Sequence, residues 1–220
     1  MDCAQRLKLR LCRDENKAIS ILQRIPEWPV SMKLDLQLDL FSMSIDAMES
    51  ALECIALCGK ALETLWLFKS GPLHYPDRLP SVLSVCRGLV SLQLELSPSA
   101  IGLCEILTSV GRDLVHLVYF HLHVKALLDT VERPTVAPCM LLAQDEHHRV
   151  LRVVFLDFPG IDLTDEAVAL LVDAAVQRCE KNPRNVNTLK VEGSSVGVCS
   201  FAALSVWVTC GIFVFVWICM

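Results

Sequence analysis

Histidine and acidic residues stand in two places where their spacing could support metal chemistry. His121 and His123 alternate, so both lie on one face if this segment is a strand. A protein metal site needs further ligands, and no third or fourth ligand is evident beside this pair. The second place is the run 145–148, Asp-Glu-His-His, where adjacent side chains diverge and a solvated loop is the expected structure. We therefore predict no metal site and no cofactor.

The cysteines do not form a ligand pattern either. All eleven are scattered along the chain, no CxxC pair occurs, and Cys54 and Cys58 have no second Cys/His pair at zinc-ligand spacing. Residues 1–25 lack the uninterrupted apolar run of a secretory signal, and there is no N-x-S/T acceptor site. These features favour reduced thiols and a cytoplasmic location, where a buried cysteine acts as a small hydrophobic residue.

Catalytic and nucleic-acid-binding signatures are missing from the sequence. No GxxxxGK[ST], GxGxxG or GxSxG motif occurs, and any catalytic triad could be assembled only by choosing residues freely. The net charge of −5 argues against the clustered Lys and Arg of a nucleic-acid surface. We expect a protein that is not an enzyme; a small cytosolic enzyme is the third alternative, and no motif supports it.

The elements that must position these side chains follow a repeating pattern. Around residues 151–158 hydrophobic residues alternate as in a strand, with Leu151, Val154 and Leu156 at LxxLxL spacing. From Thr164 the hydrophobic period becomes helical, and the LxxLxL spacing returns at Val186. One strand, one helix and the same strand pattern again form the unit of a repeat protein.

The LxxLxL template matches seven segments of the chain. Their template positions are Ala4, Leu7 and Leu9; Ser31, Leu34 and Leu36; Leu62, Leu65 and Leu67; Leu89, Leu92 and Leu94; Leu114, Leu117 and Tyr119; Leu151, Val154 and Leu156; and Val186, Leu189 and Val191. Helices are expected between them over 15–25, 45–57, 79–86, 100–110, 124–131 and from Thr164. The longest interval contains two segments that we expect to be loops, at 132–138 and 144–149.

This pattern resembles the ribonuclease-inhibitor-like class of leucine-rich repeats, including those of F-box/LRR proteins. LVSLQLELS at 89–97 and VLRVVFLDFPGIDLTDEAVALLVDAA at 150–175 carry the resemblance, which spans about residues 4–196. It implies an α/β solenoid with parallel strands on the concave side and helices on the convex side. It also implies protein recognition, including substrate recognition in a ubiquitin-ligase adaptor. The Asn usual at the turn of each repeat is replaced here, for instance by Ser97 and Pro159.

The positions between the template residues point away from the core and line up across stacked strands. They include an aromatic stripe and two charged residues, which we predict to contact a protein partner: Trp66, Phe68, Phe120, Phe155, Arg152 and Asp157. Exposed aromatic patches are uncommon without a partner, and aromatic residues are favoured interface anchors. The alternative is that loops or ordinary packing bury these rings. Neither the partner's identity nor the oligomeric state follows from the sequence.

The chain divides into a repeat region, 1–195, and a hydrophobic tail, 196–220, that carries no charge. Because a transmembrane helix needs about 20 mostly apolar residues, the tail predicts a C-terminal hydrophobic helix. Such a helix would anchor the repeats to a membrane, and a membrane-tethered scaffold is the alternative function. Two other interpretations of the tail remain. It could form a last repeat, with a buried helix over 201–208 and a strand over 212–218, or it could be an aberrant coding end.

Overall fold

The computed structural model describes residues 6–11, 14–25, 32–39, 43–68, 78–97, 100–124, 151, 153–162, 188–195 and 213–218. These residues form a single sheet of eight parallel strands, in which every strand pairs with the next one along the chain. The strands are β1 (Arg6–Leu11), β2 (Lys33–Asp39), β3 (Leu62–Phe68), β4 (Ser91–Leu96), β5 (Tyr119–Val124), β6 (Val153–Asp162), β7 (Thr188–Ser195) and β8 (Phe213–Ile218). The helices are α1 (Glu15–Arg24), α2 (Ile45–Cys58), α3 (Leu79–Val85) and α4 (Ala100–Asp113).

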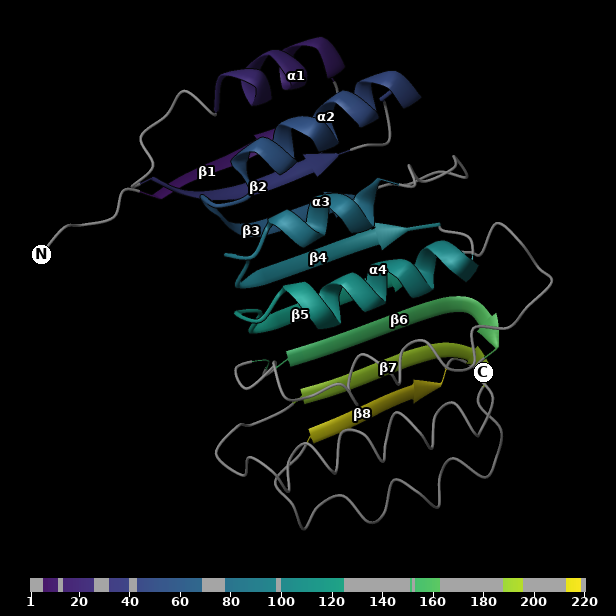
Figure 1. Cartoon of the computed structure of the whole chain (residues 1–220). Helices are drawn as coiled ribbons and strands as arrows, with labels where there is room; N and C mark the ends of the chain where they lie inside the picture. The colour runs from purple at the N-terminus through teal and green to yellow at the C-terminus, as the bar shows by residue number, and fades with distance from the viewer. Residues whose placement is uncertain are drawn as a thin grey trace, which may run out of the picture.

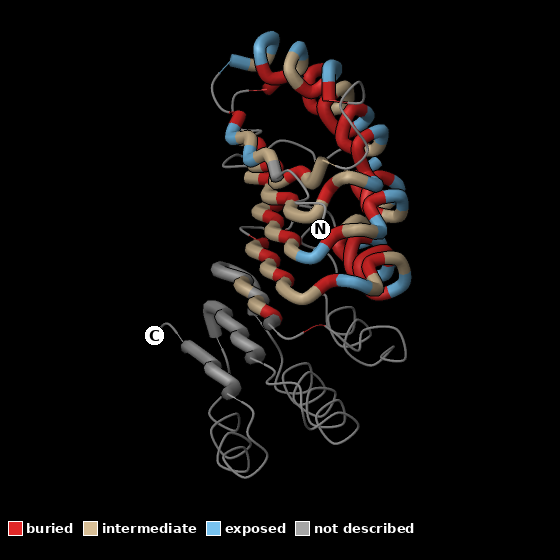
Figure 2. The backbone as a smooth tube through the Cα atoms, turned by 90° about the vertical axis from the view of Figure 1, so that its left-hand side faces the viewer, coloured by how far each residue is buried: buried red, intermediate tan, exposed pale blue. Residues whose placement is uncertain are grey.

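The four helices lie side by side over one face of the sheet, each next to its neighbours in the chain (Figure 1). Parallel strands need a crossover connection, and each of these helices supplies one between consecutive strands. Seen from the side, the helices form one layer and the strands the other (Figure 2). The structure therefore has the repeating α/β architecture that the sequence predicts, in which each unit packs on its neighbours.

Short polar side chains fix where the first two helices begin. The Asp14 carboxylate accepts a hydrogen bond from the Lys17 N–H at 3.0 Å, and the Ser44 hydroxyl accepts one from the Ala47 N–H at 3.3 Å. Such caps satisfy backbone donors that the first helical turn leaves without partners. The Ser44 N–H in turn donates to the Glu15 carboxylate at 2.8 Å, so the starts of α1 and α2 are joined.

Hydrophobic residues of the strands form two rows across the sheet, on the side that the helices cover. The strand register joins one row as Leu9, Leu36, Leu65, Leu92, Phe120 and Val154, and the other as Leu11, Leu38, Leu67, Leu94 and Leu122. Leu36, the third predicted template position of its repeat, thus pairs with Leu65, the second of the next, so the predicted template is offset by one position in β2. From β2 to β5 every member of these rows is buried. This alternation places one side of each strand in the core and the other side away from it.

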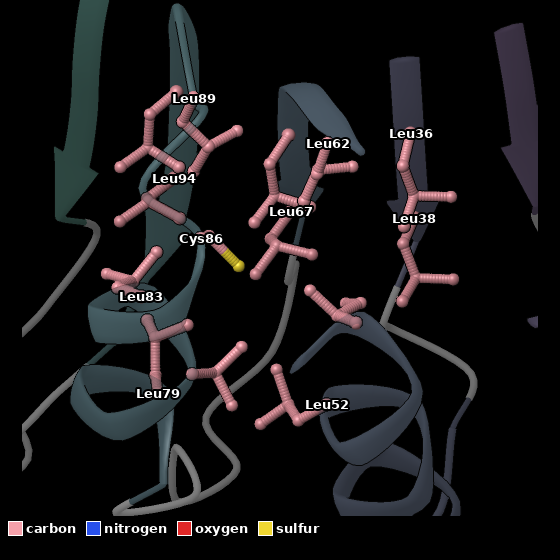
Figure 3. Close-up of a cluster of buried hydrophobic side chains, with 14 of the residues drawn as sticks. Leu36, Leu38, Leu52, Leu62, Leu67, Leu79, Leu83, Cys86, Leu89 and Leu94 are labelled. Atoms are coloured by element: carbon pink, nitrogen blue, oxygen red, sulfur yellow. The ribbon is translucent and has the colours of Figure 1, made fainter. Parts of the chain in front are cut away.

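Apolar residues of the helices close the core from the other side. Figure 3 shows Leu52 of α2 and Leu79 and Leu83 of α3 facing the leucines of β2, β3 and β4. Cys86 lies in the same cluster, fully buried, and burial raises the pKa of its thiol to about 12. The cysteines in the described part of the chain are all free, and three of them, Cys54, Cys58 and Cys86, are buried. They act as small hydrophobic residues, as the sequence predicts.

Gly59 ends α2 for a spatial reason. Its φ of −52° lies in the right-handed helical region, so this glycine is not needed for a left-handed turn. A Cβ atom there would lie 3.0 Å from the Val85 carbonyl oxygen and 3.2 Å from the Cys86 sulfur. The end of α2 thus approaches the end of α3 more closely than any other residue would allow.

The predicted register of β5 is wrong. The template was matched to Leu114, Leu117 and Tyr119, which placed Phe120 on the exposed side of the strand. In the structure Leu117 occupies the first template position, and Phe120 and Leu122 occupy the second and third, paired with Leu92 and Leu94 of β4. Phe120 is 0% exposed, whereas Tyr119 is half-buried. The LxxLxL template can be aligned with this segment in two ways, and the alignment that matches β4 is the one that fills the core.

Two helix predictions also differ from the structure. Val124, where a helix was expected to begin, is the last residue of β5 and is buried. In the hydrophobic tail, Phe213–Ile218 forms β8 paired with β7, so the predicted C-terminal helix is wrong over this stretch and the strand alternative is correct. Alternating β-branched and aromatic residues favour a strand. No helix in the described ranges has the length and apolarity to cross a membrane.

Several other predictions fall on residues outside the described ones. They are the helix from Thr164, the loops at 132–138 and 144–149, the helical residues 125–131, the template positions Ala4, Ser31 and Val186, and the tail residues 196–212 and 219–220.

Candidate partner-binding face

The side of the sheet that faces away from the helices carries a row of half-exposed side chains on every described strand from β2 to β6. We call this surface the strand face. Its half-exposed members are Lys33, Asp35, Gln37 and Asp39 of β2; Glu63, Thr64, Trp66 and Phe68 of β3; Ser91, Gln93 and Glu95 of β4; Tyr119, His121 and His123 of β5; and Phe155 and Asp157 of β6. They alternate with the core leucines, as the pleat of each strand requires.

The strand register aligns these side chains in rows that run across the sheet. The central row passes through Trp66, Gln93, His121 and Phe155, and continues at the register positions of Lys190 and Phe215. Neighbouring strands are about 4.8 Å apart, so the distance from β3 to β6 is about 14 Å. A row of this length is long enough to contact an extended or helical segment of a partner protein.

Three aromatic rings meet where β5 and β6 are paired. The Phe155 ring lies edge-on to the Tyr119 ring, with 5.7 Å between centroids and 65° between planes. It has the same relation to the His121 ring, at 5.7 Å and 73°. Edge-to-face contacts of this kind hold aromatic rings in defined orientations. Burial also raises the pKa of Tyr119, so its hydroxyl stays protonated at neutral pH.

A second pair of rings lies on β3. The Trp66 and Phe68 ring centroids are 4.1 Å apart, with a tilt of 44° between the planes. The polar residues of β4 lie between this pair and the rings of β5 and β6, so the aromatic surface consists of two groups rather than one stripe.

Two polar side-chain contacts join neighbouring strands on the strand face. The His123 Nδ1 atom contacts the Asp157 Oδ2 atom across β5 and β6, and both side chains are about a quarter exposed. The Lys33 ammonium lies 3.2 Å from the Glu63 carboxylate, where an irregularity in the β2–β3 register inserts Glu63. Exposed pairs of this kind add little stability, so their main effect is to orient the charged groups.

The structure brings some of the predicted site residues together and separates others. Phe155 and Asp157 lie beside each other on the face of β6, and Trp66 and Phe68 lie on β3. Phe120 does not belong to the surface, because it packs in the core, and Arg152 is outside the described residues. Tyr119 and His121 were missed as surface partners of Phe155. The correct alignment of Phe120 with Leu92 would have found them in the sequence.

The described ranges contain no group of three or more His, Cys, Asp or Glu side chains arranged to hold a metal ion. His121 and His123 share one face of β5, as their alternation predicts, but they have different neighbours: His121 contacts the Phe155 ring and His123 contacts Asp157. The arrangement is suited to apolar and charged contacts with another molecule.

Comparison with solved structures shows a similar fold in the tropomodulin C-terminal domain from Caenorhabditis elegans. The two structures align with a TM-score of 0.54 over 77% of this chain and 95% of that domain, at 17% sequence identity. This likeness shows a leucine-rich-repeat-like fold with parallel strands. Neither the scan against protein-family models nor the search of curated proteins found a match.

Proposed function

We propose that this protein is a non-enzymatic interaction module that binds a partner protein through the strand face. The observation that carries the proposal is the alignment of half-exposed aromatic and charged side chains across β3 to β6. The surfaces of soluble proteins seldom hold two such groups of aromatic rings, and aromatic residues surrounded by polar groups are typical of interface anchors. The fold shared with the tropomodulin domain suits this function, because solenoids present extended surfaces for binding.

The proposal extends to the type of repeat and to the location of the protein. The segments 89–97 and 150–175 support the ribonuclease-inhibitor-like class. An adaptor role in a ubiquitin ligase has only this sequence resemblance behind it, and co-purification of ligase core subunits would test it. Free buried cysteines support a cytoplasmic location. Membrane tethering draws no support from β8, since these tail residues pair with β7 as a strand.

Site-specific photocross-linking in cells tests the binding surface. A benzophenone amino acid would replace Gln93, in the centre of the strand face, and Leu57 in a control, because Leu57 is 72% exposed on the helix side. We expect one discrete cross-linked protein from position 93 and none from position 57. The cross-link should disappear when Trp66 and Phe155 are both changed to Ala. Cross-links from position 57 alone would place the interface on the helices and contradict the proposal.

A further inference from the structure

We infer that the β5–β6 part of the strand face binds a cationic side chain, an arginine or lysine, of the partner protein. In this arrangement the Tyr119, His121 and Phe155 rings contact the apolar stem of the ligand, and the Asp157 carboxylate pairs with its charge. The inference rests on the proposed function and adds to it the chemistry of the partner.

The first argument is the sign of the charges along the sheet. Strands β3, β4, β5 and β6 contain no Lys or Arg, and their described acidic side chains are those of Glu63, Glu95 and Asp157. The next Lys along the sheet is Lys190 of β7, whose register position is beside Phe155. Strand β1 is the opposite, with Arg6, Lys8 and Arg10 and no acidic residue. A partner that crosses β3 to β6 therefore meets a surface whose charge complements Lys and Arg and repels Asp and Glu.

The second argument is the position of the rings relative to the carboxylate. Phe155 and Asp157 alternate on β6, so both project from the strand face, about 6.6 Å apart along the strand. A long cationic side chain can lie with its methylene groups along an aromatic ring while its charged end reaches beyond the ring. A cation near the face of a ring is itself attracted to it. The spacing therefore suits one ligand side chain that contacts both residues.

The third argument is the capacity of the carboxylate. His123 Nδ1 contacts one oxygen of Asp157, and within the described residues the other oxygen, Oδ1, has no hydrogen-bond partner. An ionised carboxylate has about four acceptor sites and can receive two parallel bonds from a guanidinium group. The contact with His123 holds the Asp157 side chain over the face of β6, so its orientation does not have to be fixed when the ligand binds.

The other carboxylates of the strand face have neighbours that differ from those of Asp157. The Glu63 charge is compensated by Lys33, whose ammonium lies 3.2 Å away. Glu95 of β4 lies opposite His123 in the strand register, on the side of His123 away from Asp157. Asp157 combines a half-exposed carboxylate with the Phe155 ring two residues earlier on the same strand and with the His123 contact that orients it.

An NMR titration of the purified full chain tests the inference with N-acetyl-arginine methylamide as the probe. The matched probe is N-acetyl-citrulline methylamide, which has nearly the same shape and no charge. We expect saturable shifts of the His121, His123 and Phe155 resonances with the arginine probe, in the millimolar range. The citrulline probe should bind about tenfold more weakly, because it lacks the charge-assisted bonds.

Variants locate the binding to Asp157. We expect Asp157→Asn to lower the affinity for the arginine probe about tenfold, so that the protein no longer binds it more tightly than the citrulline probe. The control is Glu105→Gln, an exposed residue on α4, which also removes one negative charge but should leave the affinity unchanged. Thermal unfolding of each variant would show that the fold is intact. Phe155→Leu keeps the Asp157 charge but removes the ring, and should lower the affinity for the two probes to a similar extent.

The outcomes separate the inference from the proposed function. Equal binding of arginine and citrulline, or unchanged binding by Asp157→Asn, would overturn the inference. If position 93 still cross-links to a partner in that case, the strand face is an interface for a partner of other chemistry. If the arginine probe binds at β5–β6 while position 93 yields no cross-linked protein, the cation site stands and the proposed function falls.

Discussion

His123 and Asp157 are 34 residues apart in the sequence, yet they lie directly opposite each other on β5 and β6, with Nδ1 of the imidazole in contact with Oδ2 of the carboxylate. The parallel register creates this pair, together with the ring cluster beside it. A repeat protein brings distant segments together in this way because each strand pairs with its predecessor at a fixed offset. The surface of the protein is therefore determined by the alignment of its repeats.

The first prediction concerns this pair. Replacing His123 by Gln should change the free energy of unfolding by less than about 1 kcal/mol, because both groups are partly exposed and water screens their attraction. The arginine probe should bind somewhat more weakly, since the orientation of Asp157 is then less restricted. Urea unfolding and the NMR titration would measure the two effects. A loss of stability of several kcal/mol would show that the pair has a structural role.

The second prediction concerns the core row. Leu92→Ala should destabilise the protein by about 2–5 kcal/mol, because Leu92 is 0% exposed and its removal leaves a cavity between β3 and β5. Leu57→Ala is the control: the same atoms are removed from a side chain that is 72% exposed, so the effect should be within about 0.5 kcal/mol. Urea denaturation of the two variants gives the comparison. Similar losses would mean that the assignment of the two leucines to core and surface is wrong.

The third prediction concerns the close approach of α2 and α3. Gly59→Ala should destabilise the protein by about 1–3 kcal/mol, because the new methyl group would lie 3.0 Å from the Val85 carbonyl oxygen. At Gly88 the nearest atom to an added Cβ is 3.4 Å away, which is ordinary contact, so Gly88→Ala should be neutral or slightly stabilising. Thermal unfolding of both variants tests the difference. A stable Gly59→Ala variant would show that the two helices can separate at little cost.

The fourth prediction concerns thiol reactivity. Burial raises the pKa of Cys58 to about 11 and that of Cys86 to about 12, so very little thiolate forms at pH 8. Alkylation of the native protein with iodoacetamide, followed by peptide mass spectrometry, should therefore modify the exposed Cys104 much faster than Cys58 or Cys86. Denaturant should remove the difference. Rapid labelling of Cys86 in the native state would contradict its place in the core.

The same shifts predict how stability depends on pH in alkaline solution. Both thiols have a higher pKa in the folded state than in the unfolded chain. Their contribution to the free energy of unfolding is therefore fully present at pH values below the thiol pKa of the unfolded chain. It is lost as the pH rises from about 9 towards 11–12, because the unfolded thiols release protons first. Between pH 9 and 11 the free energy of unfolding, measured with urea, should decrease less steeply with pH in Cys86→Ala than in the parent protein. An unchanged slope would indicate that Cys86 is accessible to water.

The strand–helix period, the helices α1 to α4 and the core leucines of β2, β3 and β4 could be predicted from the sequence. Each of these rests on local information, namely the change of hydrophobic period between strand and helix. Because the LxxLxL spacing alternates sides of a strand, it also predicted which side of β3 carries Trp66 and Phe68. These features depend on residues that are neighbours in the chain.

Tertiary structure alone decided the register of β5, the end of β5 at Val124 and the strand at the tail. The segment from Leu114 to Leu122 fits the template in two frames, and only alignment with β4 selects the one that buries Phe120. Likewise, the length and apolarity of 196–220 suit a helix, whereas the alternation within 213–218 suits a strand, and pairing with β7 decides between the two. The physical reason is the same in both cases. Hydrogen bonds between strands and burial against a neighbouring repeat are interactions between distant residues, so no local pattern contains them.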